Sequence, residues 1–530
     1  MHPNGTMNDL AGADLRGLDR FEARKVAVEK LKALGALVKE EPYENKVGFS
    51  QRARVPIEPR LSEQWFLKYP SVEPSRACVE TGAMKFHPER WSKVYDHWMV
   101  NLQDWCISRQ LWWGHRIPVW YRRKSASENA GEVETYCGIE APAGEGWEQD
   151  PDVLDTWFSS WLWPFATMGW PEQTDTLKKF YPTTDLVTGP DIIFFWVARM
   201  IMAGYEFMGD LPFRNVYFTG IIRDKQGRKM SKTLGNSPDP LDLIAKYGAD
   251  ALRFGTMRGA PLGEDVLFDE KDVELGRNFC NKLWNACRFR QLQGGEAQGE
   301  IDPALLTNDD KWILLKLDQA IREISGALAG YRFNEAAHTI YRFFWSEFCD
   351  WYLEASKAFL YGDDAALKAN TLAVSDFVLS HMLRLFHPFL PFITEELWHG
   401  MGYSQDMPET QGGQTIMFAP WPKPLDEDFR AHYGLDDAVL KFVEDKYELV
   451  RQGRNLRREA NIPSAKRVKY VLQPAVPVSA HDQASLKVLL NADPLELDPN
   501  YQPRKGTPVV HATLGELHLP LEGLIDVAAE

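Results

Sequence analysis

A cluster of basic residues between positions 223 and 236 is the strongest candidate for chemistry in this sequence. The segment reads RDKQGRKMSKTLGN and places five cations within ten residues around Gly227. They are Arg223, Lys225, Arg228, Lys229 and Lys232. Lysines on a loop bind polyphosphate as point charges that can reposition during a reaction. The segment therefore predicts phosphate binding, with an ordinary solvated basic loop as the alternative. The Walker pattern G-x-x-x-x-G-K-[ST] is absent, so the loop is not a P-loop.

The residues that precede the loop predict the elements that position it. TTDLVTG, ending at Gly189, is typical of a short strand, and RNVYFTGII is typical of a second one. Between them, DIIFFWVARMIMAGYEFMG predicts a helix that is apolar on all sides. A strand, a helix and a strand of these lengths form a βαβ unit in a buried parallel sheet. Ligands bind beyond the carboxyl ends of such strands, so the candidate site comprises Thr188–Asp191 and the segment after Gly220.

Asp191 stands at the start of this helix, where a carboxylate caps the helix or favours its dipole. The near-apolar run Ile192–Met208 follows it and contains Arg199 and Glu206. A charge in mid-span is costly in lipid, and 17 residues is a short span. We therefore expect a helix buried in protein and no membrane insertion.

Composition sets the broad class of the protein. A length of 530 residues suggests three or four domains at about 150 residues each. Asp and Glu number 75 against 60 Lys and Arg, which gives a net charge of −15. A generally basic surface is therefore excluded, although local basic patches can still bind nucleic acid. The six cysteines form no C-x-x-C pair and no zinc-finger spacing with histidine, which argues against a structural zinc and against a disulfide framework.

The remaining segments predict a helical region followed by a mixed one. Helical periodicity marks Arg20–Leu37, with a stop at Gly35, and several segments between residues 270 and 400. The latter are Glu274–Arg290, Lys311–Ala329, Asn334–Leu360 and Asn370–Phe386. Short loops between such helices indicate an antiparallel bundle. One more charged helix is expected at 430–460, and β-like pieces follow Pro463.

Four tryptophans recur every seven residues between positions 91 and 112. They are Trp91, Trp98, Trp105 and Trp112. On a straight helix this spacing drifts by only about 20° per heptad, so it predicts one buried aromatic stripe. A platform for stacking nucleobases is the alternative interpretation.

Several motifs resemble one known family. Lys229-Met230-Ser231-Lys232-Thr233 resembles the KMSKS loop of class I aminoacyl-tRNA synthetases. WCISRQ at 105–110 with LWWGHRIPVWY, and PDVLDTWFSSWLWPF at 151–165, resemble the valyl-tRNA synthetases. GRNFCNKLWNA at 276–286 and HPFLPFITEELW at 387–398 resemble the family's anticodon-binding bundle. The resemblance spans nearly the whole chain.

The sequence departs from the family pattern in three ways. Thr233 replaces the last serine of the loop, and Thr219 stands where many valyl enzymes have histidine. The family's His-x-Gly-His signature is absent among the 12 histidines. We therefore expect an interior piece of a longer enzyme, without the first half of the nucleotide fold and the terminal coiled coil. The expected parts are an editing-domain remnant at 1–66, the second half of the catalytic domain at 67–268, an anticodon-binding domain at 269–428 and an α/β tail at 429–530.

The resemblance implies roles for individual residues. Lys229 and Lys232 would stabilise charge on the phosphates, with Lys232 in contact with ATP. Ser231 and Thr233 would hydrogen-bond the loop or the phosphates, and Met230 would pack. Asp191 would hold the valine ammonium group. Trp157 and Ile192 would line the amino-acid pocket, although both could be ordinary core residues.

The resemblance also implies residues that contact tRNA. Arg277, Asn281 and Arg288 share one face of a predicted helix, as i, i+4 and i+11. Arg454, Arg457 and Arg458 belong to a basic run from Lys446 to Lys469 that suits a phosphate backbone. A solvated helix face and a salt-bridged helix are the respective alternatives.

Together these inferences predict an α/β fold, with the second half of a Rossmann-type parallel sheet before a helical bundle and a small α/β tail. The implied function is valine–tRNA ligation, with this chain unable to form the adenylate alone. ATP with Mg²⁺, L-valine and valine tRNA are the expected ligands, without a protein-bound metal. The full-length protein would be a cytoplasmic monomer. The alternatives are an isoleucyl-tRNA synthetase piece, against which residues 112–114 and 157–160 argue, and a non-catalytic tRNA-binding protein.

Overall fold

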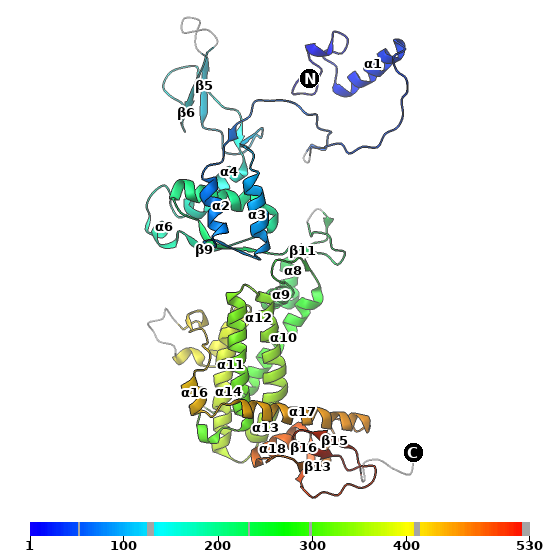
Figure 1. The fold of residues 1–530 in the computed structure, drawn as a ribbon, viewed down its shortest axis with the longest axis vertical. Coiled ribbons are helices and arrows are strands. Elements are labelled where there is room, and N and C mark those ends of the chain that lie inside the picture. The colour runs from blue at the N-terminus through cyan, green and yellow to red at the C-terminus, as the bar shows by residue number, and fades with distance from the viewer. Residues whose placement is uncertain (51–52, 124–131, 232–233, 296–298, 407–413, 522–530) are drawn as a thin grey trace. The chain divides into compact units, whose positions relative to one another are not determined.

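The computed structural model describes residues 1–50, 53–123, 132–231, 234–295, 299–406 and 414–521 (Figure 1). The chain divides into two compact units, Met1–Trp65 and Phe66–Glu530. The first unit ends one residue before the boundary expected at residue 66.

The first unit contains the helix predicted near its start. Helix α1 spans Arg20–Ala33, and the Asp19 carboxylate caps it by accepting a hydrogen bond from the backbone N–H of Phe21 at 2.9 Å. The helix ends at Leu34, and Gly35 follows with a φ of +64°, a conformation that glycine adopts without strain. The predicted stop at Gly35 is therefore confirmed.

The second unit begins with the parallel sheet that the sequence predicts. Its order is β2–β10–β9, with β2 at Lys85–His87, β9 at Thr183–Thr188 and β10 at Phe213–Phe218. Both neighbours run parallel to β10, and β9 aligns Asp185 with Asn215. The predicted βαβ unit is confirmed, because β9 and β10 are adjacent and joined by a helical segment.

The helical segment between β9 and β10 runs from Pro190 to Met208. It comprises the 3₁₀ turn η2 (Pro190–Ile192), the π-helical η3 (Ile193–Val197), helix α7 (Ala198–Ala203) and the π-helical η4 (Gly204–Met208). All six residues of α7 are buried, as expected for a helix that is apolar on every side. Within the described ranges, no helix is both long enough and apolar enough to span a membrane.

The predicted tryptophan stripe is wrong beyond its first two members. Helix α3 spans Arg90–Val100 and carries Trp91 and Trp98, and it ends at Asn101. Trp105 lies on the short strand β3 (Trp105–Cys106), whereas Trp112 is 98% exposed in a loop. The seven-residue spacing therefore does not persist as a helical repeat, since the helix stops before the third tryptophan.

Short elements complete this part of the chain. Strands β5 (Val119–Arg123) and β6 (Val133–Cys137) pair antiparallel. The other elements are β1 (Phe66–Leu67), α2 (Val72–Glu80), β4 (Ser108–Arg109), β7 (Glu148–Gln149), β8 (Val153–Leu154), α4 (Thr156–Ser160), α5 (Trp163–Ala166), α6 (Asp175–Phe180), β11 (Ile222–Arg223), α8 (Pro240–Tyr247), α9 (Ala249–Arg258) and β12 (Val266–Leu267).

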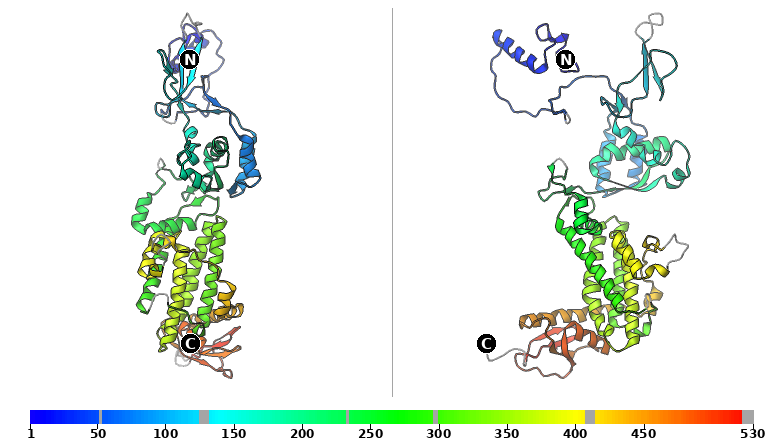
Figure 2. Two further views of the ribbon diagram at one scale, coloured as in Figure 1. Left: turned by 90° about the vertical axis from the view of Figure 1, so that its left-hand side faces the viewer. Right: turned by 180° about the vertical axis from the view of Figure 1, so that it is seen from behind.

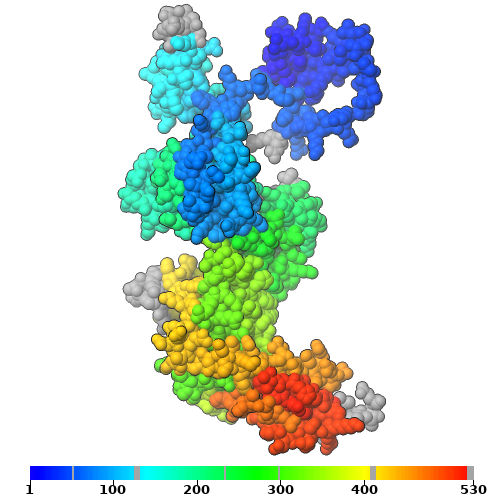
Figure 3. Space-filling view, viewed as in Figure 1, coloured from blue at the N-terminus to red at the C-terminus, as the bar shows by residue number. Residues whose placement is uncertain are grey.

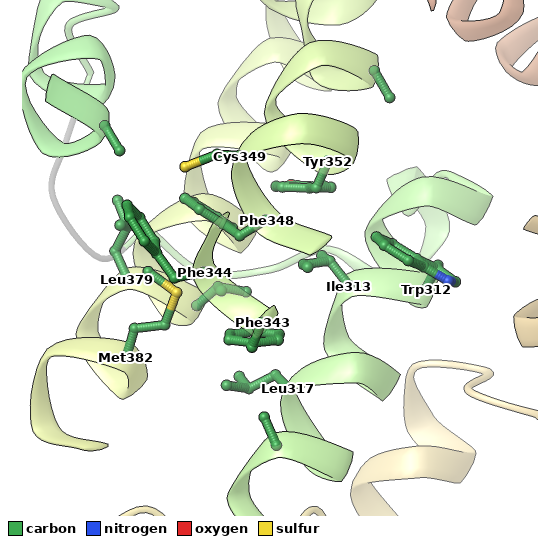
Figure 4. Close-up of a cluster of buried hydrophobic side chains, with 14 of the residues drawn as sticks. Trp312, Ile313, Leu317, Phe343, Phe344, Phe348, Cys349, Tyr352, Leu379 and Met382 are labelled. Atoms are coloured by element: carbon green, nitrogen blue, oxygen red, sulfur yellow. The ribbon is translucent and has the colours of Figure 1, made fainter. Parts of the chain in front are cut away.

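The helical bundle confirms the predicted all-helical region. Its elements are α10 (Glu270–Leu292), α11 (Asn308–Ala329), α12 (Phe333–Tyr341), the π-helical η7 (Arg342–Tyr352), α13 (Leu353–Leu360), α14 (Ala365–Phe386) and α15 (Pro391–Gly400). The helices α11 and α14 lie side by side in both further views (Figure 2). Ile313 and Leu317 of α11 point toward Phe343 of η7 in a buried apolar core (Figure 4). This packing supplies the apolar burial that holds the bundle together.

The end of the described chain forms a four-stranded sheet. Its order is β14–β13–β16–β15, with bounds Ala492–Leu497, Val468–Pro474, Gly515–His518 and Val509–Ala512. Helices α16 (Glu427–His432), α17 (Asp437–Glu459) and α18 (Ala480–Leu489) accompany it. Figure 3 shows this segment, in orange and red, against one end of the bundle. The predicted α/β tail is thus a sheet and helices that share a core with the bundle.

Candidate active site

The carboxyl ends of β9 and β10 bring two distant segments of the chain together. Asp191 follows β9, and the basic loop follows β10 through the short strand β11, which pairs in parallel with β12. The turn between β10 and β11 is tight, because a Cβ atom added to Gly220 would lie 1.7 Å from the carbonyl oxygen of Glu264. Only glycine fits this approach, and the path of the chain into the loop depends on it.

Lys229 meets Asp191 at this edge of the sheet. Its Nζ atom donates a hydrogen bond to Oδ2 of Asp191 at 3.2 Å, and both side chains remain more than half exposed. The two residues are 38 positions apart in the sequence. The structure therefore joins the basic loop to the residue expected to hold a substrate ammonium group.

The other described cations of the loop also have carboxylate partners. Arg223 pairs with Asp265, Lys225 with Asp269 at 3.3 Å, and Arg228 with Asp224 at 2.8 Å. Lys232 and Thr233 lie outside the described residues. In this structure each of these three cations is thus paired with a carboxylate of the same chain.

Asp224 organises the base of the loop. Its carboxylate accepts hydrogen bonds from the backbone N–H groups of Gln226 and Arg228 and from the Asn236 amide at 2.9 Å. The hydrogen bond from Asn236, together with those from Arg228 and Gln226, holds the pKa of the Asp224 carboxyl well below its usual value. Sequence reasoning missed Asp224, although an aspartate three residues before a glycine is a recognised turn signal, here completed by Gly227 at φ +77°.

Ser231 and Met230 take structural positions in the loop. The backbone N–H of Ser231 donates to Oδ1 of Asn236 at 2.9 Å, and its hydroxyl accepts from the backbone N–H of Leu234 at 3.2 Å. The backbone N–H of Met230 donates to the carbonyl of Ile222 at 3.3 Å, and the residue is half-buried. Asn236 therefore joins the far end of the loop to its base.

Trp157 and Ile192 both lie next to the helical segment that follows Asp191. Trp157 is half-buried on α4, and its ring stacks with that of Phe195 at a centroid distance of 5.9 Å. Ile192 is half-buried in the turn η2. Neither side chain is fully enclosed in the core, so each is able to contact a ligand.

A network of polar contacts that the sequence did not reveal holds the start of α4 in place. The buried Asp155 caps α4 by accepting from the backbone N–H of Trp157 at 3.0 Å, and it also pairs with Arg109. Trp105 donates its indole N–H to Asp155 at 3.2 Å, and the buried Arg199 lies over the Trp105 ring at 3.6 Å. This network fixes the position of Trp157 through the start of its helix.

The bundle residues expected to contact tRNA lie on one helix. Arg277, Asn281 and Arg288 are all on α10, where Asn281 and Arg288 are exposed and Arg277 pairs with Glu274 at 3.0 Å. A cavity of about 670 Å³ is lined by other residues of α10, among them Lys282, Asn285 and Phe289, and by Trp351, Lys357 and Arg454. The carboxylates of Asp350 and Glu354 also line it, and they pair with Lys282 at 2.8 Å and with Lys357 at 2.6 Å.

Not all of the basic run from Lys446 to Lys469 lies at the surface, as the sequence had led us to expect. Arg457 is buried, and its guanidinium donates to the backbone carbonyls of Leu490 at 2.8 Å and Pro463 at 2.9 Å. Lys446 is also buried, between two carboxylates. The expectation that these two residues face a phosphate backbone is therefore corrected, because their charged groups are used inside the protein.

The two neighbours of Arg457 remain at the surface. Arg454 donates to the carbonyl of Leu489 at 2.8 Å and lies over the ring of Trp351 at 5.5 Å, at the rim of the cavity. Partial burial of the guanidinium lowers the pKa of Arg454 from its usual value, although the residue as a whole stays exposed. Arg458 is exposed. Among the described residues, no group of three or more His, Cys, Asp or Glu side chains is arranged to hold a metal ion.

Comparison with known proteins gives a consistent family. Residues 17–269 match a family described as tRNA synthetases class I (I, L, M and V), and residues 310–472 match the anticodon-binding domain of tRNA ligase. The valine–tRNA ligase of Thermotoga maritima is 45% identical over 99% of this chain and 58% of its own length. That of Carboxydothermus hydrogenoformans is 46% identical over 99% of this chain and 59% of its own length. The chain thus spans less than two thirds of the relatives it matches.

Solved structures give the same fold. The methionyl-tRNA synthetase of Mycobacterium tuberculosis, in complex with methionyl-adenylate, superposes with a TM-score of 0.53 at 18% identity and covers 71% of each chain. At this identity the similarity concerns the fold alone.

Proposed function

Because the chain belongs to the valine–tRNA ligase family of class I aminoacyl-tRNA synthetases, we propose that it takes part in attaching L-valine to its tRNA at the expense of ATP. The observation that carries the proposal is the meeting of Lys229 with Asp191 at the carboxyl edge of the parallel sheet. An acidic group for an ammonium and a loop of cations for phosphates lie there side by side. These are the two charges that an amino acid and ATP present in adenylate formation.

In the first step, the valine carboxylate attacks the α-phosphate of ATP and pyrophosphate leaves. Negative charge builds on the phosphoryl oxygens, and preorganised cations stabilise it more strongly than they stabilise bound ATP. We assign Lys229 and Lys232 to this role, with Lys232 in contact with ATP. Ser231 and Thr233 hold the loop or the phosphates through their hydroxyl groups. Mg²⁺ arrives with ATP as part of the substrate.

In the amino-acid pocket, we assign Asp191 to the valine ammonium, and Trp157 and Ile192 to the side chain. The partial exposure of Trp157 and its support by Asp155 favour this assignment. An apolar pocket of this kind rejects the isosteric threonine by only about 10², a magnitude for which valyl-tRNA synthetases are themselves the standard example. We also propose that the enzyme is specific for valine and that its domains in this chain meet at residues 66, 268 and 428. The full-length protein would be a monomer in the cytoplasm.

A tRNA-binding role for the bundle follows and can be tested on this chain. We expect binding that weakens with salt by about 0.7–0.9 log units per phosphate contact per log unit of salt. Base readout should favour tRNA with a valine anticodon, at about 1–3 kcal/mol per wrong base by analogy with DNA sites. The double substitution Arg277→Ala and Arg288→Ala should reduce this preference. Arg458→Ala should weaken all tRNAs alike, because it removes a phosphate contact only.

Filter binding at two salt concentrations, with valine tRNA and with non-cognate tRNAs, distinguishes a loss of base readout from a loss of phosphate contacts. Arg322→Ala is the control, since it removes an exposed cation from α11 and leaves α10 unchanged. It should change neither affinity nor preference. If valine tRNA has no advantage at either salt concentration, the anticodon-reading role of the bundle is wrong.

A further inference from the structure

Tyr331 joins the helical bundle to the parallel sheet β2–β10–β9. It lies in the turn between α11 and α12, and its ring stacks on that of His87 at a centroid distance of 4.1 Å and on that of Tyr217 at 5.9 Å. Its hydroxyl group donates a hydrogen bond to Oδ1 of Asp185. His87 belongs to β2, Tyr217 to β10 and Asp185 to β9, so one side chain of the bundle contacts all three strands.

The backbone at Tyr331 has a conformation that a bulky side chain rarely adopts. Its φ is +58°, in the left-handed region. The residue closes α11 in a Schellman motif: its N–H donates to the carbonyl of Leu328 at 3.1 Å, and the N–H of Arg332 donates to that of Ala327 at 2.8 Å. Glycine is the usual residue at this position, yet Gly330 lies one residue earlier. Strain of this kind persists only where the surroundings fix the residue, so the contacts with the sheet compensate for it.

The groups on the sheet that contact Tyr331 are held in place by the strands. His87 and Tyr217 are register partners on β2 and β10. Asp185 on β9 is the register partner of Asn215, and Nε2 of His87 lies 3.2 Å from Oδ1 of Asn215, within hydrogen-bond distance. Burial and the neighbouring Asp185 carboxylate raise the pKa of Tyr331 to about 12, so its hydroxyl stays protonated and donates at neutral pH.

We infer that Tyr331 is a positioning residue, which sets the helical bundle on the parallel sheet so that tRNA held by the bundle reaches the catalytic site in register. The inference rests on the proposed function, because it takes the bundle as the tRNA-binding part and the sheet as the catalytic part. The strands that contact Tyr331 also carry the site, since β9 leads to Asp191 and β10 leads to the basic loop. In the proposed reaction tRNA takes part only in the second step. Tyr331 should therefore act on transfer to tRNA and not on formation of the adenylate.

The contact itself is tested in the 530-residue chain by hydrogen exchange and mass spectrometry. Tyr331→Gly removes the ring and the hydroxyl but suits the left-handed backbone, so α11 and α12 should stay folded. Amides of β9 and of the turn between the two helices should exchange faster by about tenfold or more, as for a lost hydrogen bond to a charged group. Tyr361→Gly is the matched control, because it makes the same change at an exposed position of the bundle. If exchange in β9 is the same in both variants, Tyr331 does not hold the bundle on the sheet.

The role in transfer is tested in a chimera in which this chain replaces the matching segment of the Thermotoga maritima relative. Charging of valine tRNA should slow by about tenfold in Tyr331→Phe, which keeps the ring, and by up to about 10² in Tyr331→Gly, because a misplacement of about 1 Å far from the chemistry can cost that much. The KM for tRNA and the valine-dependent ATP–pyrophosphate exchange without tRNA should stay unchanged, since the anticodon contacts and the adenylate site both remain. Tyr361→Phe is the control and should leave both steps unchanged.

Substitutions at Asp185 show whether its hydrogen bond with Tyr331 is the contact that acts. Asp185→Asn keeps an acceptor oxygen and should charge tRNA like the unchanged chimera, whereas Asp185→Ala should match Tyr331→Phe. The double variant with Asp185→Ala and Tyr331→Phe should be no slower than either single variant, because both substitutions remove the same interaction.

The outcomes separate this inference from the proposed function. Equal slowing of exchange and charging in Tyr331→Gly would overturn the inference, because a general loss of structure explains it. Charging at the unchanged rate would overturn it as well. If the unchanged chimera shows no valine-dependent exchange, the proposed function fails instead, and hydrogen exchange in the 530-residue chain still decides whether Tyr331 holds the bundle in place.

Discussion

Replacing Lys446 with methionine should lower the free energy of unfolding by about 3–5 kcal/mol, because it leaves buried carboxylates without their counter-charge. The ammonium group of Lys446 is buried and donates to Asp309 at 2.8 Å and to Asp482 at 2.9 Å. Burial alone would lower the pKa of Lys446, but the two carboxylates and their hydrogen bonds outweigh it and raise the pKa above the usual value. The lysine thus stays charged, and it ties α17 to α11 of the bundle and to α18.

Urea unfolding followed by circular dichroism measures this loss. Lys441→Met is the matched control, since it makes the same change at an exposed position of the same helix and should cost less than about 0.5 kcal/mol. Adding Asp309→Asn and Asp482→Asn to Lys446→Met should recover part of the stability, because the buried site then carries less unpaired charge. If Lys446→Met is as stable as Lys441→Met, the buried ion pairs do not hold the tail on the bundle.

Replacing Lys232 with alanine should slow adenylate formation by about 10²–10³, the usual effect of losing one preorganised donor at a developing charge. The measurement uses a chimera in which this chain replaces the matching segment of the Thermotoga maritima relative. Because the lost interaction acts mainly in the transition state, the KM for valine should change little. Lys225→Ala is the control within the loop and should be close to the unchanged chimera.

Asp191→Ala in the same chimera should instead raise the KM for valine and change the rate at saturating valine little. It removes the partner of the valine ammonium group, so valine binding should weaken by about ten- to a hundredfold, as for a lost hydrogen bond to a charged group. Rates at saturating valine separate the two substitutions. If Lys232→Ala raises only the KM for valine and leaves the rate unchanged, the roles of the loop and of Asp191 have been assigned wrongly.

Local sequence patterns predicted the βαβ unit of this protein. The helix after Asp191 is one long apolar run and its α7 part is buried throughout, so composition alone distinguished it, and the two short strands on either side completed the unit. The tryptophan spacing was misleading, because a regular interval carries no information about where a helix ends. Helix α3 stops at Asn101, and the later tryptophans follow other elements.

The charged residues show more clearly what local sequence cannot predict. Lys446 and Arg457 belong to a basic run that is typical of a surface, yet both are buried. Their partners include Asp309, 137 residues away from Lys446, and the carbonyl of Leu490. Such pairings depend on tertiary packing and leave no local signal. The same holds for the contact between Lys229 and Asp191, of which the sheet rule predicted the location but not the ion pair.

ATP–pyrophosphate exchange, measured with valine and with isoleucine, tests the central proposal most directly. The 530-residue chain alone should show no valine-dependent exchange, because its sequence has no His-x-Gly-His motif and the parallel sheet in the described ranges has three strands. The chimera with the Thermotoga maritima relative should show exchange that depends on valine and is lost in Asp191→Ala. A folded chimera that prefers isoleucine, or one whose exchange survives Asp191→Ala unchanged, would contradict the proposal that this chain carries the valine site.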